Sequence, residues 1–201
     1  AVAMLPLSGL IHNPLIVYNL SVLLSYPLCG LAMYWLAHYI CRDHRAAFLA
    51  GLIFAYCPYR ERHIEHLNQL SAEGIPLIIL GFEAARKEGG PWRWAGFGAA
   101  IMLCTTLSLY YLAFVLLGLA LYVAILLFQR HPQAGIRVVA RRAWRGVWAL
   151  GALLPLEGAL LLPYLHTETT VGQERKLSDI VYFSADVCDF FHAGPQSLLY
   201  G

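Results

Sequence analysis

Long apolar runs separated by short charged stretches are the feature that most limits how this chain can fold. Residues 14–40, 92–108, 109–128 and 144–165 approach or exceed the roughly 20 apolar residues that a helix needs to cross a bilayer. The chain is 59% hydrophobic and only 13% charged, about half the charged share of a soluble domain. These patterns predict four membrane-crossing helices, the first of them kinked at Pro27.

Two further apolar segments are shorter than a usual membrane-crossing helix. Residues 46–59 would form about 21 Å of helix, and residues 70–85 are similar but contain Glu73, Pro76 and Glu83. A hydrocarbon core is about 30 Å thick, so we expect either short helices with polar outer ends or a re-entrant pair buried in protein. The fold class is therefore predicted to be all-α, a polytopic transmembrane helical bundle of about six membrane segments.

Lysine and arginine are divided unequally between the connections. The connections at 41–45, 86–93 and 129–145 hold ten of the 14 basic residues, whereas the 60–71 loop and the 166–201 tail together hold four. Because basic loops are retained in the cytoplasm, the first three connections are predicted to lie inside. The loop, the tail and both ends of the chain are then extracytoplasmic.

This topology also divides the chain into regions. Residues 1–165 form the predicted transmembrane domain, and residues 166–201 form the start of an outer region, whose aromatic residues argue against disorder. The first residues have the character of a cut edge, so we expect a fragment of a larger protein. The net charge of +2 is too small to indicate nucleic acid, and membrane lipid is the expected partner.

The densest polar cluster lies between the two short apolar segments. It contains Arg60, Glu61, Arg62, His63, Glu65, His66 and Asn68. On a helix, His63 and His66 would share one face, so His63, Glu65 and His66 are candidate ligands of a divalent metal ion. Arg60 and Arg62 are candidates for binding a phosphate, and Glu61 and Asn68 complete the substrate-binding set. The alternative is an amphipathic interfacial helix whose charges simply face water.

Glu157 is a separate candidate inside the last apolar run, six residues before Pro163. An acidic residue within a membrane segment usually has a functional role, and we predict that Glu157 takes part in substrate binding. The alternative is a protonated or paired structural carboxyl group. Glu73 and Glu83 lie closer to the ends of their segment and are expected at the interface.

Several short motifs resemble those of bacterial GT-C superfamily membrane glycosyltransferases. The motifs are Tyr18-Asn19-Leu20, Gly30, Ala46-Ala47, Gly51, Pro58-Tyr59-Arg60, His63, His66-Leu67, Pro163-Tyr164 and the stretch from Tyr182 to Asp186. They are most similar to those of polyprenyl-phosphate-sugar-dependent transferases and YfhO-like membrane proteins. The resemblance covers most of the chain but is diffuse.

The resemblance implies transfer of a sugar from a polyprenyl-phosphate carrier to a glycan or lipid acceptor at the outer face of the bacterial inner membrane. It also implies that the 60–68 loop binds a metal ion or the donor phosphate. The catalytic acid of such enzymes lies in the first outer loop, but no acidic residue precedes Asp43, which is predicted to be cytoplasmic. We therefore expect the catalytic acid upstream of Ala1.

A protein without enzymatic activity is the alternative function. A transporter, a flippase or an assembly protein for lipid-linked glycans would also need polar groups among apolar helices. Transporters often contain paired broken helices in two repeated halves. This chain contains one such pair, at residues 46–59 and 70–85, and no second half.

Overall fold

The computed structural model describes residues 5–128, 151, 154–156 and 158–162, and within them the fold is all-α, as the sequence predicts. Contacts divide the chain into two units, residues 1–161 and residues 162–201. The helices described below all belong to the first unit. Most of the predicted 144–165 segment lies outside the described residues, although residues 151, 154–156 and 158–162 are helical.

The first long helix, α2 (Pro14–Cys41), follows the short α1 (Leu5–Leu10) and is about 42 Å long. Its start is fixed locally, because the Asn13 side chain accepts a hydrogen bond from the backbone N–H of Leu15 at 3.0 Å. The helix continues past Pro27 and ends where Arg42 adopts a left-handed backbone conformation. The first predicted membrane segment is therefore a single helix.

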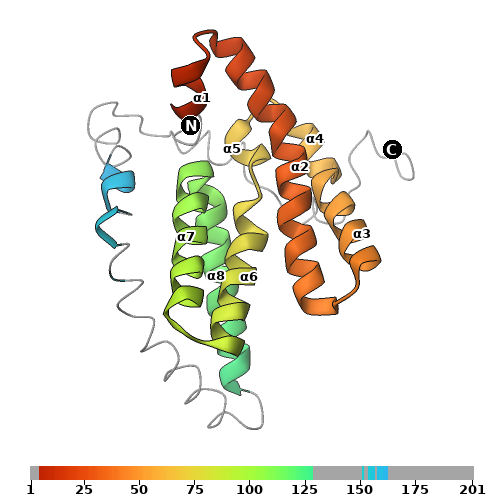
Figure 1. Cartoon of the computed structure of the whole chain (residues 1–201), viewed down its shortest axis with the longest axis vertical. Helices are drawn as coiled ribbons and strands as arrows, with labels where there is room; N and C mark the ends of the chain where they lie inside the picture. The colour runs from red at the N-terminus through yellow and green to blue at the C-terminus, as the bar shows by residue number, and fades with distance from the viewer. Residues whose placement is uncertain (1–4, 129–150, 152–153, 157, 163–201) are drawn as a thin grey trace, which may run out of the picture. The chain divides into compact units, whose positions relative to one another are not determined.

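The next helix, α3 (His44–Ala55), packs beside the second half of α2 (Figure 1). The Asp43 carboxylate caps its start by accepting from the backbone N–H groups of Arg45 and Ala46. Glycines allow the two backbones to approach closely, since a Cβ on Gly51 would lie 2.6 Å from the carbonyl oxygen of Gly30. The predicted short segment thus begins two residues earlier than expected and ends at Ala55.

Two very short helices, α4 (Pro58–Arg62) and α5 (Leu67–Leu70), connect α3 to the rest of the fold. They turn back along α2 (Figure 1), and the Tyr18 hydroxyl donates to the carbonyl oxygen of Ile64 at 3.0 Å. The polar segment therefore packs against the side of a long helix and does not form one continuous amphipathic helix.

A three-helix group completes the described fold. It consists of α6 (Gly74–Glu88), α7 (Pro91–Leu107) and α8 (Leu109–Phe128), and α6 contacts all of α2, α7 and α8. Ile78 and Phe82 of α6, Cys104 of α7, and Leu112 and Val115 of α8 belong to its buried core. The extended backbone of Ser108 separates α7 from α8, at the place where the predicted runs 92–108 and 109–128 meet.

Two of the described helices are long and apolar enough to cross a membrane, judged by length and composition: α2 and residues 109–126 of α8. We name two ends of the described structure. We call the end with α4 and α5 the loop end. The opposite end, with the α2–α3 and α6–α7 connections, is the basic end and carries Arg42, Arg45, Arg86, Lys87 and Arg93.

Candidate functional site

The side chain of Arg60 lies inside the loop end and is only 1% exposed. Its Nε and Nη2 atoms donate to the carbonyl oxygen of Leu70 at 3.1 and 2.9 Å, and Nη2 also donates to Ser25 Oγ at 3.0 Å. Nη1 donates to the carbonyl oxygen of Ala55, and the guanidinium carbon lies 4.6 Å from the centre of the Tyr26 ring. We call these five residues the arginine cluster.

The arginine cluster holds a buried cation with neutral acceptors. Each hydrogen bond to the charged group is stronger than one between neutral partners, and the Tyr26 ring adds a cation–π contact. The guanidinium thereby connects α2, the end of α3 and the end of α5. It faces the protein interior, whereas binding a donor phosphate would need donors on the surface of the loop.

A buried thiol and carboxyl group lie next to this cluster. The thiol of Cys29 donates a hydrogen bond to Glu73 Oε2, with 3.2 Å between the sulfur and the oxygen. The same sulfur lies 3.8 Å from the carbonyl oxygen of Leu70. Cys29 is fully buried and Glu73 is 6% exposed. The sequence predicts an interfacial Glu73, so its burial at the start of α6 is a correction. The immediate cause is its packing against Cys29, which lies 44 residues away in the chain.

Glu73 also borders a cavity of about 410 Å³ between α2, α5, α6 and α7. Ser25 and Ser71 supply further polar groups beside Glu73, and most of the remaining lining is leucine. A carboxyl group at the edge of an apolar cavity can exchange a proton or bind a hydroxyl group. Sequence reasoning missed this site, although an acid directly before the glycine that begins an apolar run is a usable signal.

The other residues of the predicted polar cluster lie on the loop surface. Glu61, Arg62, Glu65, His66 and Asn68 are exposed, and His63 is half-buried. The His63 ring stacks on Tyr59 with centroids 4.3 Å apart, and its Nδ1 atom is 2.8 Å from the carbonyl oxygen of Tyr59.

The helix that would place both histidines on one face is not formed, because residues 63–66 make a turn. The His63 and His66 rings lie edge to face with centroids 6.3 Å apart. Within the described ranges, no three His, Cys, Asp or Glu side chains form a group able to hold a metal ion. The structure therefore does not bring His63, Glu65 and His66 together as a ligand set. Glu157 lies outside the described residues.

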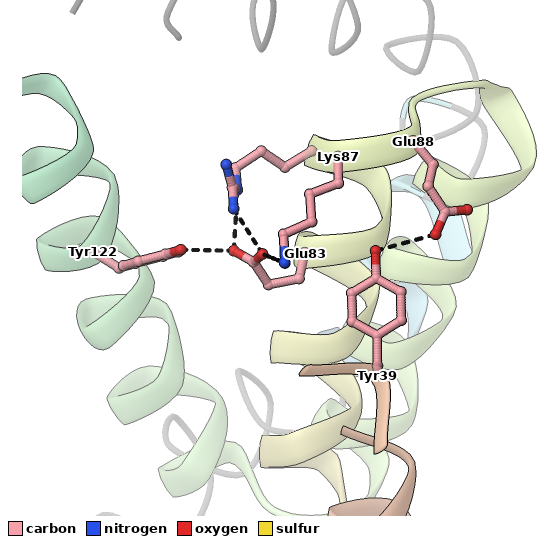
Figure 2. Close-up of polar contacts among 6 residues, drawn as sticks. Tyr39, Glu83, Lys87, Glu88 and Tyr122 are labelled. Atoms are coloured by element: carbon pink, nitrogen blue, oxygen red, sulfur yellow. Dashed lines mark hydrogen bonds and ion pairs between the residues drawn. The ribbon is translucent and has the colours of Figure 1, made fainter. Parts of the chain in front are cut away.

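The basic end contains a second polar group, the glutamate cluster, formed by Glu83, Arg86, Lys87 and Tyr122 (Figure 2). Glu83 Oε2 pairs with Arg86 Nη2 at 2.7 Å and with Lys87 Nζ at 3.0 Å, and the Tyr122 hydroxyl donates to Oε1 at 2.8 Å. The hydrogen bonds that Arg86 donates to the Glu83 carboxylate raise the pKa of Arg86 above its usual value. The expectation of an interfacial Glu83 is also corrected, because this carboxylate is buried among its partners.

Tyr39 links the glutamate cluster to neighbouring charges. Its hydroxyl donates to Glu88 Oε1 at 3.1 Å (Figure 2), and Lys87 Nζ lies 5.3 Å from its ring centre. Glu88 in turn pairs with Arg93. These contacts join the ends of α2, α6 and α7.

An apolar groove runs between the loop end and the basic end. A second cavity, of about 590 Å³, lies between α2, α6 and α7 and reaches Arg42 and Arg93. It shares Trp35, Leu77 and Leu103 with the cavity beside Glu73. We call the two cavities together the α6 groove, because residues of α6, α2 and α7 line both of them. In Figure 1, α6 lies between α2 and α7.

The α6 groove combines apolar walls with a carboxyl group at one end and two guanidinium groups at the other. Such a site suits an elongated amphiphilic ligand, since apolar walls bury a chain and a few polar groups fix its orientation. Searches of protein-family models, of curated proteins and of solved structures find no match to this chain.

Proposed function

We propose that the chain belongs to a polytopic membrane protein with about six membrane segments. Large apolar side chains on the outer faces of the helices support this: Phe48 of α3 is 62% exposed and Phe114 of α8 is 67% exposed. Only 11% of the apolar part of α8 is buried inside the structure, whereas the core helix of a soluble protein is mostly buried. Apolar surface of this extent is stable in lipid and costly in water.

The clustering of basic residues supports the orientation inferred from the sequence. Arg42, Arg45, Arg86, Lys87 and Arg93 all belong to the basic end. The proposed orientation therefore places the basic end in the cytoplasm and the loop end, with both termini of the chain, on the outer side of a bacterial inner membrane.

For the activity, we propose GT-C-like transfer of a sugar from a polyprenyl-phosphate carrier to an outer-face acceptor. The observation that carries this proposal is the Glu73 carboxyl group, which borders an apolar cavity directly beneath the polar loop. The cavity would bury isoprenoid units of the carrier. Glu73 would bind a sugar hydroxyl, and the exposed Arg62 together with His63 would meet the phosphate. Arg60 would hold the loop in place through the arginine cluster.

Transfer assays on the full-length protein in membranes test this activity. The probe is a polyprenyl-phosphate-linked hexose with a radiolabelled sugar, and the readout is label in the acceptor fraction. We expect Glu73→Gln and Arg62→Ala each to reduce transfer at least about tenfold at unchanged expression, since each removes a hydrogen bond to a charged group. Glu88→Gln is the matched control, because it neutralises an acid at the other end of the fold.

Two results would contradict the transferase. If both Glu73→Gln and Arg62→Ala transfer sugar at the native rate, the proposed site is wrong. Movement of the labelled donor across vesicle membranes, with no transfer to any acceptor, would instead favour the transporter or flippase alternative, for which an intramembrane acid is also typical.

A further inference from the structure

The part of the α6 groove at the basic end has an open, apolar wall. Small residues of α6 and α7 form much of it, among them Gly81, Ala84, Gly96 and Ala99. A Cβ atom added to Gly96 would meet no atom within 4 Å. The wall is therefore hollow at Gly96, and a chain-like ligand can lie directly against the backbone of α7 there.

Two guanidinium groups lie at the rim of this cavity. Arg93 forms an ion pair with Glu88. The Arg42 guanidinium carbon lies 5.3 Å from the centre of the Tyr39 ring, and within the described part of the chain no carboxylate pairs with it. The rim therefore carries positive charge that the protein only partly neutralises.

His38 is a further polar residue that lines the same cavity. It lines the cavity one helical turn before Arg42, and its Nδ1 atom is buried with no hydrogen-bond partner in the structure. The His38 ring also stacks on the His44 ring of α3, with centroids 4.1 Å apart, so this side chain is held in place at the cavity wall.

The backbone of Arg42 ends α2, and its N–H group donates to the carbonyl oxygen of His38 at 2.9 Å. With φ 57° and ψ 22° it is the one described residue other than glycine with a positive φ. This position at a helix end favours glycine, because a side chain strains the left-handed conformation. A basic side chain near a helix C-terminus is electrostatically favourable, and here it is also directed to the rim of the groove.

We propose that the basic end of the α6 groove binds one anionic phospholipid. Its phosphate lies between Arg42 and Arg93, and one acyl chain follows the groove toward Leu103. Arginine binds phosphate with paired hydrogen bonds, and the cytoplasmic leaflet is the one rich in anionic lipid. This inference rests on the proposed membrane location and orientation but not on the proposed transferase activity.

Quenching of tryptophan fluorescence by brominated lipids tests the site, since Trp35 and Trp92 line the cavity. The full chain is reconstituted into phosphatidylcholine vesicles that contain either brominated phosphatidylglycerol or the same amount of brominated phosphatidylcholine. We expect stronger quenching by the brominated phosphatidylglycerol. Arg42→Gln should lower this preference about fivefold. Arg45→Gln removes an equal charge three residues away, outside the cavity, and should leave it unchanged.

A second pair of variants tests the groove and not the charge. Gly96→Leu places a side chain in the hollow, where its Cβ atom meets no atom within 4 Å, and should abolish the preference for phosphatidylglycerol. Gly118→Leu is its matched control, because Gly118 is also a helical glycine with open space around it but lines a different cavity, beside α8.

The possible failures are distinguishable. Equal quenching by the two brominated lipids, or an unchanged preference in both Arg42→Gln and Gly96→Leu, overturns the phospholipid site and leaves the membrane location standing. No quenching by either lipid overturns the membrane location and the lipid site together. None of these readouts depends on sugar transfer.

Discussion

The arginine cluster at the loop end and the glutamate cluster at the basic end both bury a charged side chain, but they stabilise that charge differently. Arg60 is surrounded by two backbone carbonyl oxygens and a hydroxyl group, and no carboxylate of the described residues is bonded to it. Glu83 has two cations within its own helix, at the i+3 and i+4 positions, and one tyrosine from α8.

The bonds of Arg60 connect segments that are distant in the sequence, whereas those of Glu83 are mostly local. The acceptors of Arg60 lie at residues 25, 55 and 70, so its loss would release three segments at once. The cations that pair with Glu83 lie one turn away in α6, so the helix would keep its place without them. Among the described residues, Tyr122 is the one partner through which Glu83 bonds to another helix. The loop end should therefore depend on its charge far more than the basic end does.

The largest expected effect is that of Arg60→Ala. Removing one partner of a buried charged network costs about 3–5 kcal/mol, because the acceptors at Ala55 and Leu70 lose their donors. Unfolding in detergent micelles titrated with a denaturing detergent measures the loss. Arg62→Ala, an exposed neighbour, should change the unfolding free energy by less than about 0.5 kcal/mol. Equal stability of the two variants would refute the role of the arginine cluster.

Maleimide labelling of Cys29 gives the same variant a local readout. Cys29 is fully buried beside the arginine cluster, whereas Cys41 at the basic end is exposed. In the native protein we expect Cys41 to react and Cys29 to stay protected, and Arg60→Ala should expose Cys29. Mass spectrometry of peptides resolves the two sites. Protection of Cys29 in Arg60→Ala at native secondary structure would show that the cluster does not hold the loop.

Glu83→Gln should have an intermediate effect at the basic end. It keeps the shape of the side chain but removes the charge that pairs with Arg86 and Lys87, at a cost of about 2 kcal/mol. The same unfolding titration measures it. If Glu83→Gln lowered the unfolding free energy as much as Arg60→Ala does, the two clusters would not differ in how strongly the fold depends on their charge.

Tyr122→Phe isolates the hydrogen bond that joins Glu83 of α6 to α8. Its hydroxyl donates to Glu83 at 2.8 Å, and its removal should cost about 1 kcal/mol. A double-mutant cycle with Glu83→Gln should show that the two changes are not additive, since they remove the same contact. Strict additivity would mean that Tyr122 stabilises α8 through its ring alone.

The smallest effect is expected for Glu88→Gln. Its ion pair with Arg93 is substantially exposed, and exposed pairs contribute below about 1 kcal/mol. Raising the salt concentration should reduce even this difference, because the Debye length falls to about 3 Å at 1 M salt. If Glu88→Gln lowered the unfolding free energy by the same amount at low and high salt, the hydrogen bond from Tyr39, and not the ion pair, would be what stabilises this end.

The helices could be predicted from the sequence because each depends on local patterns. The apolar run of 14–40 and the capping residue Asn13 define α2, and Ser108 separates two runs that became α7 and α8. The predicted end at Tyr59 was four residues too long, since Cys57 and Pro58 begin a new short helix. Boundaries of this kind depend on a few backbone angles that hydropathy does not report.

The candidate site was less predictable because its contacts are distant in sequence. Nothing local to Arg60 indicates that its partners would be Ser25 and the carbonyl oxygen of Leu70. The pairing of His63 with His66 assumed a helix where the chain forms a turn. Glu73 is likewise buried by Cys29, and no single-sequence pattern links those positions.

The hydrogen bonds of Arg60 also bear on the order in which the protein assembles during synthesis. Ser25 and Ala55 precede Arg60 in the chain, but its main acceptor, Leu70, is made ten residues later. At typical rates of translation that delay is about one second. A nascent chain that stops before Leu70 therefore carries a cation without its principal acceptor, and we expect it to be degraded faster than one that extends just past Glu73. The end of α5 must therefore be made before Arg60 can be bonded to its principal acceptor and join the end of α3 to it.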